Sequence, residues 1–145
     1  MVKNIPVSKN NNSKVAIIAI HGWKGNLSSM EHVANALNIK CAQWTFIQGP
    51  YAAGDNKYSW FEGNEKEGWN YQESFDLLYK TILNINQSGF PKSKIFLLGF
   101  SQGACLAMEF IIRQKFSIGG IIPIAGFIEN KNKFKNGIVD GSQST

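Results

Sequence analysis

The sequence predicts an α/β fold in which helices cover both faces of a parallel sheet. Two continuous apolar runs, at residues 15–20 and 95–98, and an interrupted one at 118–125 lack the alternation of half-exposed strands, so they suit strands buried on both faces. Between these runs, apolar residues recur at helical spacing. Strands that alternate with helices along a chain in this way form parallel sheets.

A helix is expected after the first strand. Ser28 or Ser29 can cap its N-terminus, and Glu31 then lies in the first turn, where a negative charge is favourable. One face of this helix is apolar and consists of Met30, Val33, Ala34 and Leu37. Residues 40–47 predict a second strand, which ends before Gly49-Pro50.

Residues 51–69 are rich in glycine and aromatic residues and are predicted to form one long loop, a length that in compact domains usually indicates a functional role. The helix that follows ends at Gly89, and its apolar face consists of Phe75, Leu78, Ile82 and Ile85. A third helix is expected over residues 102–114. The last strand, 118–125, is interrupted by Gly119, Gly120 and Pro123.

The chain of 145 residues predicts a single domain. We divide it into a flexible N-terminal arm (1–14), a partial α/β domain (15–128) and a polar C-terminal tail (129–145). A hydrophobic fraction of 43% excludes a disordered chain. No apolar run approaches the roughly 18 residues of a membrane helix, so we expect no integral membrane segment.

The composition also limits which binding partners and which cellular compartment we expect. The polar N-terminus shows no signal peptide, so we expect a cytoplasmic protein with Cys41 and Cys105 reduced. The net charge is +5, but the lysines are scattered or confined to the two ends, without a basic stripe among aromatic residues. We therefore expect no nucleic-acid partner. We also find no spacing that predicts a metal site, a phosphate loop or a cofactor.

The chemistry is concentrated in the run Gly99-Phe100-Ser101-Gln102-Gly103, which contains the pattern Gly-x-Ser-x-Gly. A buried strand leads directly into it and a helix leads directly out, which is the context that a nucleophile elbow requires. Such an elbow holds Ser101 in a strained backbone conformation, and Gly99 and Gly103 allow the strand and helix backbones to approach each other. The N–H of Gln102 then lies at a helix N-terminus, where it can stabilise an oxyanion.

A second glycine-rich turn, His21-Gly22-Trp23-Lys24-Gly25, follows the first strand. It can present another backbone N–H, that of Trp23, to the same oxyanion. We interpret His21 as a residue that orders this loop through hydrogen bonds, not as a catalytic base. His32 is interpreted as a structural or solvated residue of the first helix.

Together these stretches resemble the phospholipase/carboxylesterase group of α/β-hydrolases, which includes the acyl-protein thioesterases. The resemblance covers roughly residues 15–127 and includes Ser59-Trp60-Phe61-Glu62 between the two glycine-rich turns. It implies an α/β-hydrolase-like sheet and hydrolysis of a small-molecule ester or thioester. It also implies that Ser101 is the nucleophile, that the N–H groups of Trp23 and Gln102 form the oxyanion hole, and that Trp60 and Phe61 line the acyl pocket.

The chain also departs from that family. The triad order in this fold is Ser, Asp, His, yet no His follows Ser101 and the only later Asp is Asp140, in a segment without a preceding apolar strand. We therefore expect a C-terminally truncated hydrolase that lacks the last strands and is weakly active or inactive. The strand at residues 118–125 would then be an exposed edge, through which the chain could self-associate.

Two other interpretations remain open. The chain could be a non-catalytic α/β-hydrolase-fold protein that binds acyl or lipid-like ligands. Dienelactone-hydrolase-like chemistry is a weaker alternative, because that group uses a Cys at the elbow. Here the elbow holds Ser101, and Cys105 lies one turn into the following helix.

Overall fold

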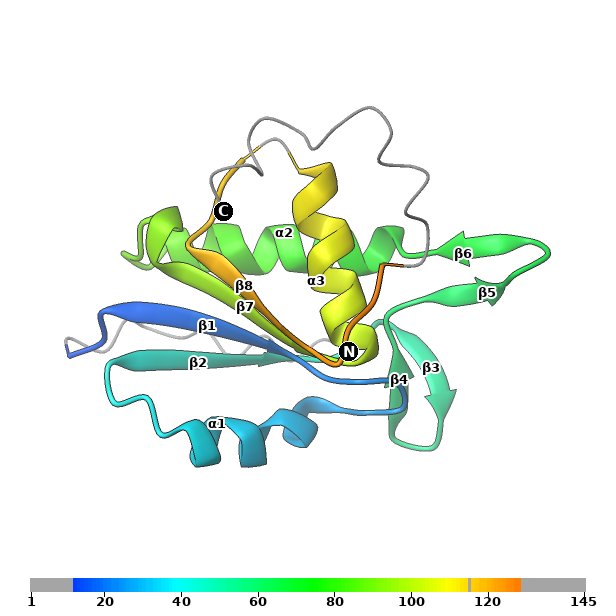
Figure 1. The fold of residues 1–145 in the computed structure, drawn as a ribbon, viewed down its shortest axis with the longest axis horizontal. Coiled ribbons are helices and arrows are strands. Elements are labelled where there is room, and N and C mark those ends of the chain that lie inside the picture. Colours follow the sequence, from blue (N-terminus) through cyan, green and yellow to red (C-terminus); the bar gives the residue numbers. More distant parts are fainter. Residues whose placement is uncertain (1–11, 115, 129–145) are drawn as a thin grey trace.

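The computed structural model describes residues 12–114 and 116–128, and it shows a four-stranded parallel sheet with helices on both faces (Figure 1). The strand order is β2-β1-β7-β8, and every neighbouring pair in this sheet is parallel. The strands are β1 (Val15–Ile20), β2 (Ala42–Ile47), β7 (Ile95–Phe100) and β8 (Gly120–Ile124). Each overlaps one of the four predicted strands, so the predicted α/β class is confirmed.

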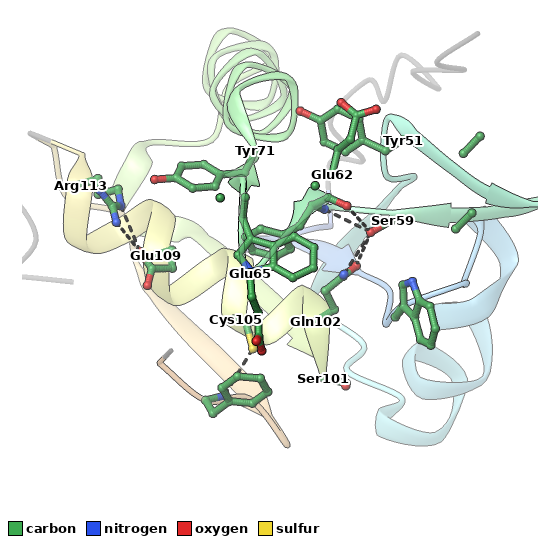
Figure 2. A pocket seen from close by; sticks show the side chains of 18 residues that line it. Tyr51, Ser59, Glu62, Glu65, Tyr71, Ser101, Gln102, Cys105, Glu109 and Arg113 are labelled. Carbon is green, nitrogen blue, oxygen red and sulfur yellow. Dashed lines mark hydrogen bonds and ion pairs between the residues drawn. The ribbon is translucent and has the colours of Figure 1, made fainter. Parts of the chain in front are cut away.

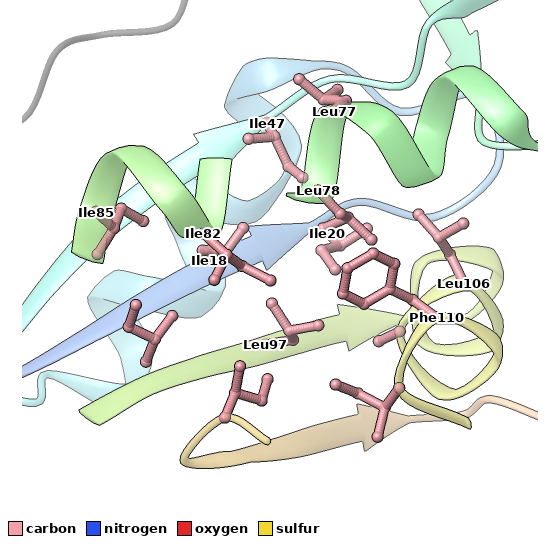
Figure 3. Packing of buried hydrophobic residues seen from close by; sticks show 14 of the residues in the cluster. Ile18, Ile20, Ile47, Leu77, Leu78, Ile82, Ile85, Leu97, Leu106 and Phe110 are labelled. Carbon is pink, nitrogen blue, oxygen red and sulfur yellow. The ribbon is translucent and has the colours of Figure 1, made fainter. Parts of the chain in front are cut away.

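The helices divide between the two faces of the sheet. Helix α1 (Glu31–Leu37) covers one face, and α2 (Gln72–Gln87) and α3 (Gln102–Arg113) cover the other (Figure 1). Successive strand residues point to opposite faces, so Ile18 packs with α2 and α3 while Ile17 packs on the α1 side. The larger of these two clusters, drawn in Figure 3, includes Ile20, Leu78, Leu97, Leu106 and Phe110.

The first helical segment begins earlier than predicted. A 3₁₀ turn, Leu27–Met30, precedes α1, and Asn26 caps it: the Ser28 N–H donates to the Asn26 side chain, and the Ser29 hydroxyl accepts from the Asn26 N–H. The prediction that Ser28 or Ser29 caps the helix was therefore wrong. Leu37, predicted on the apolar face, is exposed, and Asn38 ends α1 directly after it in the left-handed conformation.

The stretch predicted as one long loop consists of two β-hairpins instead. The first pairs β3 (Tyr51–Gly54) with β4 (Lys57–Ser59), and the second pairs β5 (Glu62–Asn64) with β6 (Gly68–Asn70). The Tyr58 N–H donates to the Gly25 carbonyl at 2.9 Å, which fixes the first hairpin against the glycine-rich turn after β1. Both hairpins lie beyond the carboxyl ends of β1 and β7 (Figure 1).

Parts of the predicted domain division lie outside the described residues, namely 1–11 of the arm and the tail 129–145. Where the arm is described, it is attached to the sheet, since the N–H of Lys14 donates to the Cys41 carbonyl at 2.8 Å. A short 3₁₀ turn, Lys92–Lys94, leads into β7. None of the described helices has the length and apolar character needed to cross a membrane.

Candidate active site

Ser101 occupies the sharp turn between β7 and α3. Its φ of 51° and ψ of −114° form a backbone conformation that a residue with a side chain rarely adopts. A Cβ atom on Gly99 would overlap the carbonyl of Gly103, and a Cβ on Gly103 would overlap the carbonyl of Ile20. The strained serine and the two close backbone approaches match the geometry of a nucleophile elbow.

Two backbone N–H groups near Ser101 have no acceptor among residues 12–114 and 116–128. One belongs to Trp23, in the turn after β1, and the other to Gln102, in the first turn of α3. The two segments meet closely, since a Cβ built on Gly22 would lie 3.6 Å from the Cβ of Ser101. Unpaired N–H groups beside a serine, one of them at a helix N-terminus, are suited to stabilise an oxyanion.

His21 is fully buried beneath this turn, and backbone groups use both of its ring nitrogens. Nδ1 lies 2.6 Å from the Gly22 carbonyl, to which it donates, and Nε2 accepts from the Gly49 N–H at 3.0 Å. Burial lowers the pKa of His21, so the neutral ring is favoured. A ring held in this way orders the loop, as predicted, and has no nitrogen available to take a proton from Ser101.

The side chain of Gln102 ties the elbow to the segment between the two hairpins. Its Oε1 accepts from the Trp60 N–H at 2.9 Å. Its Nε2 donates to the Ser59 hydroxyl at 3.0 Å (Figure 2). The Ser59 hydroxyl in turn donates to the Phe61 carbonyl at 2.7 Å. A single glutamine therefore supplies a backbone N–H to the site and holds the adjacent wall with its side chain.

A cavity of about 1070 Å³ opens beside Ser101 (Figure 2). Ser101 and Gln102 form one wall, and the two hairpins form another. The aromatic side chains around it belong to Trp23, Tyr51, Phe61, Trp69, Tyr71 and Phe127. Burial, together with nearby carboxylates, raises the pKa of Tyr51, so its phenol remains neutral at ordinary pH. The cavity is large enough for a small-molecule ester, and its lining combines these aromatic side chains with polar and charged ones.

One wall of the cavity is a row of α3 residues at four-residue spacing that starts at Ser101 and continues through Cys105, Glu109 and Arg113. Arg113 lies 2.9 Å from the Glu109 carboxylate, and its guanidinium group is 5.5 Å from the centre of the Tyr71 ring. This row was not predicted from the sequence, although residues four apart on a helix share one face, so the i, i+4 spacing from Ser101 could have indicated it. Tyr51, Trp69 and Tyr71 were not predicted either, since nothing in the predicted loop indicated which aromatic side chains face the cavity.

The structure brings most of the predicted site residues together, with one exception. Ser101, Gln102, Trp23 and Phe61 all line the cavity. Trp60 does not, because its side chain is fully buried in the core, where its indole N–H donates to the His21 carbonyl at 2.8 Å and its ring lies 4.9 Å from the imidazole. The prediction that Trp60 lines the acyl pocket is therefore corrected: Trp60 supports the site from beneath.

Within the described residues, no His, Asp or Glu side chain forms a hydrogen bond with the Ser101 hydroxyl. His32 is exposed on α1, and Asp140 lies outside the described residues. Cys105 is a free thiol on the cavity wall, and its sulfur accepts from the Phe127 N–H at 3.4 Å. The described residues also contain no group of three metal-ligating side chains.

Comparisons with known proteins show the family and the fold of this chain. The sequence model of the phospholipase/carboxylesterase family matches residues 3–143. An uncharacterized hydrolase of Schizosaccharomyces pombe is 25% identical over an alignment of 126 residues, and the match covers 76% of this chain and 52% of that protein. The chain thus spans about half the length of the curated relative it matches.

Solved structures show the same fold. Arabidopsis thaliana SOBER1 aligns with a TM-score of 0.72 at 19% identity, over 88% of this chain and 69% of that one. A phospholipase/carboxylesterase from Dyadobacter fermentans aligns with a TM-score of 0.63 at 26% identity, over 88% of this chain and 59% of that one. The predicted α/β-hydrolase-like sheet is therefore confirmed.

Proposed function

This chain belongs to the phospholipase/carboxylesterase family, and from that premise we propose that it carries the acyl-transfer site of a serine hydrolase that cleaves carboxylic ester or thioester bonds. The observation that carries the proposal is the strained Ser101 at the elbow, beside two unpaired backbone N–H groups and a cavity of about 1070 Å³. We also propose that the substrate is a small molecule and that the protein acts in the cytoplasm.

In the proposed reaction, the Ser101 hydroxyl oxygen attacks the carbonyl carbon of the substrate and loses its proton to a base. The carbonyl oxygen becomes an oxyanion, which the N–H groups of Trp23 and Gln102 stabilise. The intermediate then expels the alcohol or thiol, which takes up a proton and leaves the acyl group on Ser101. Water attacks this acyl-enzyme, and its hydrolysis releases the carboxylic acid and restores the serine.

The base is the part of this reaction for which the described residues offer no candidate. Both nitrogens of His21 are bonded to backbone groups, and no His follows Ser101 in the sequence. In triad enzymes, an oxyanion hole and substrate binding alone retain about 10³–10⁴-fold catalysis over water. We therefore propose only weak hydrolysis, well below that of a complete triad enzyme, for the 145-residue polypeptide by itself.

The lack of a candidate base among the described residues also favours one alternative. In it, the protein is non-catalytic and holds an acyl or lipid-like ligand in the cavity. Trp23 and Trp69 both line that cavity, so ligand binding should change tryptophan fluorescence. Saturable quenching by a short fatty acid, equal in the parent and in Ser101→Ala, together with the absence of hydrolysis, would favour this alternative.

Hydrolysis of p-nitrophenyl butyrate by the purified chain, compared with Ser101→Ala, tests the main proposal. We expect a slow, protein-dependent rate that Ser101→Ala lowers further. Equal rates for two folded proteins would reject Ser101 as a nucleophile in this polypeptide. Circular dichroism of both proteins serves as the control for folding.

A further inference from the structure

The turn after β1 contains a buried imidazole whose hydrogen bonds converge on a single peptide group. That group joins Gly22 to Trp23, so it carries the Gly22 carbonyl oxygen and the Trp23 N–H. Because a trans peptide is planar, its carbonyl and its N–H point in opposite directions. Whatever fixes the direction of the Gly22 carbonyl therefore also fixes the direction of the Trp23 N–H.

Two donors hold that carbonyl. The Nδ1 of His21 lies 2.6 Å from the Gly22 oxygen, and the Gly25 N–H donates to the same oxygen at 3.0 Å. Two hydrogen bonds to one carbonyl restrict rotation of the peptide plane and also polarise its N–H. The Trp23 N–H on the other side of this plane has no acceptor within the described part of the chain.

The imidazole itself is held from three sides. Its Nε2 accepts from the Gly49 N–H at 3.0 Å, which leaves Nδ1 as the protonated nitrogen. The indole N–H of Trp60 donates to the His21 carbonyl at 2.8 Å, and the two rings lie 4.9 Å apart. Gly25 closes the third side, since a Cβ there would come within 2.7 Å of Nδ1.

The support continues to the other half of the site. The N–H of Trp60 donates to the side chain of Gln102, and the Ser74 hydroxyl of α2 donates to the Trp60 carbonyl at 2.7 Å. His21, Trp60 and Ser74 are fully buried. One buried network therefore links the peptide that carries the Trp23 N–H to the residue that carries the Gln102 N–H.

We propose that His21 is a positioning residue for acyl transfer: its Nδ1–H orients the Gly22–Trp23 peptide so that the Trp23 N–H points at the oxyanion, and Trp60 holds the imidazole in place. The inference rests on the proposed function, because it assigns the Trp23 N–H to the oxyanion hole. It gives the histidine a part in the reaction without any transfer of a proton from Ser101.

Two substitutions at His21 separate orientation from packing. The side-chain amide of Asn can replace Nδ1 as a donor to the Gly22 carbonyl, whereas Gln reaches the Nε2 position and can accept from the Gly49 N–H. His21→Asn therefore keeps the bond that the proposal needs, and His21→Gln loses it. Both substitutions remove the ring from a buried site, so both should lower stability to a similar degree.

The first readout is hydrolysis of p-nitrophenyl butyrate. We expect His21→Gln to lower kcat about 10-fold or more with KM changed less than about 2-fold, because an oxyanion donor acts mainly in the transition state. His21→Asn should retain most of the parent kcat. Equal losses of kcat in the two variants would overturn the proposal, since a merely structural histidine predicts that result.

The second readout needs no catalysis and separates this inference from the proposed function. In amide ¹H–¹⁵N NMR spectra, the Trp23 cross-peak should stay near its parent position in His21→Asn and move in His21→Gln. If the parent chain does not hydrolyse esters, the proposed function fails, and this comparison still decides the role of His21. Trp23 cross-peaks that respond alike in both variants would overturn the role.

A milder variant covers the case in which neither His21 variant folds. Trp60→Phe removes the donor to the His21 carbonyl but leaves both imidazole nitrogens intact. It should shift the Trp23 cross-peak and lower kcat by less than His21→Gln does. The matched control is Thr81→Val, which removes a buried hydroxyl that donates to the Leu77 carbonyl at 2.7 Å on α2. A Trp23 response no larger in Trp60→Phe than in this control would contradict the proposal.

Discussion

The two sides of Ser101 are built very differently. On the β1 side, strand residues 16–20 are buried, and a hydrogen-bonded network of His21, Trp60 and Gln102 lies beneath the turn that carries the Trp23 N–H. On the β8 side, Ile122, Pro123 and Ile124 are all exposed, and β8 is an edge strand among the described residues. The side that carries the Trp23 N–H, a proposed oxyanion donor, is therefore organised by packing, whereas the described residues supply no group for proton transfer from Ser101.

This contrast indicates that two parts of the proposed acyl transfer, stabilisation of the oxyanion and proton transfer, depend on different parts of the structure. The proposed oxyanion donors are backbone N–H groups, one in the turn after β1 and one at the start of α3, so the central strands and that helix are enough to position them. In α/β-hydrolases the Asp and His of the triad follow the nucleophile in chain order, and no His follows Ser101 in this sequence. The predictions below test how far the first part is independent of the second.

The largest expected effect is at the elbow glycine that contacts β1. In Gly103→Val the new side chain would meet the carbonyls of Ile20 and His21, which are backbone atoms that cannot move aside. We expect a loss of about 3 kcal/mol or more in the free energy of unfolding, measured by urea denaturation. Gly68→Ala is the control, because nothing lies within 4 Å of its Cβ and only its φ of +89° is unfavourable. A loss in Gly103→Val no larger than in this control would contradict the close approach.

Truncation of one isoleucine on each side tests the comparison directly. Ile20, at the end of β1, is fully buried, whereas Ile124, at the end of β8, is 37% exposed. Ile20→Ala should lower the free energy of unfolding by about 2–5 kcal/mol, and Ile124→Ala by about 1 kcal/mol or less. Similar losses in the two variants would mean that β8 is as well packed as β1.

The buried histidine predicts a pH dependence of stability. Burial lowers the pKa of His21 in the folded state, so below about pH 6.5 the unfolded chain binds a proton that the folded chain does not. Stability is therefore full above that pH and falls as the pH decreases toward the folded pKa, by up to about 1.4 kcal/mol per pH unit.

Urea denaturation at several pH values checks this slope. His21→Gln should remove the part of the slope between pH 6.5 and the folded pKa, and His32→Gln, on the exposed surface of α1, should leave it unchanged. An unchanged slope in His21→Gln would show that the imidazole is not held neutral by the fold.

The smallest effect on folding is expected for substitutions in β8, an edge strand among the described residues. Such substitutions can still alter self-association. We predict self-association through β8, where Ile122 and Ile124 are exposed beside Phe127. Ile124→Lys should change the free energy of unfolding by about 0.5 kcal/mol or less and shift the chain toward monomer. Light scattering coupled to size-exclusion chromatography measures this shift, and a parent that is monomeric at high concentration would contradict it.

Sequence patterns predicted the sheet well, because buried parallel strands appear as continuous apolar runs. They also predicted the elbow, whose strained serine and glycines follow from one short motif. The hairpins in residues 51–69 were missed, although the Gly54–Lys57 turn, with a left-handed Asn56 at φ 48°, has residues typical of a tight turn. Strands of three or four residues are too short for alternation to be informative.

The orientation of Trp60 could not be predicted from the sequence for a different reason. It is flanked by Ser59 and Phe61, and its neighbour Phe61 does line the cavity. Of these two adjacent aromatic residues, one faces the core and the other faces the cavity. The sequence does not indicate which one, since both are large and apolar, and only the tertiary contact with His21 decides it.

The most direct test of this account is covalent labelling of Ser101 by an alkyl fluorophosphonate, followed over hours by mass spectrometry. A preorganised oxyanion hole without a base should make Ser101 react about 10³-fold faster than an exposed serine such as Ser28, and Ser101→Ala should abolish the adduct. Gln102→Met, which leaves the backbone N–H in place but removes the acceptor for the Trp60 N–H, should slow the reaction. A folded chain in which Ser101 reacts no faster than Ser28 would contradict the claim that the elbow is organised for acyl transfer.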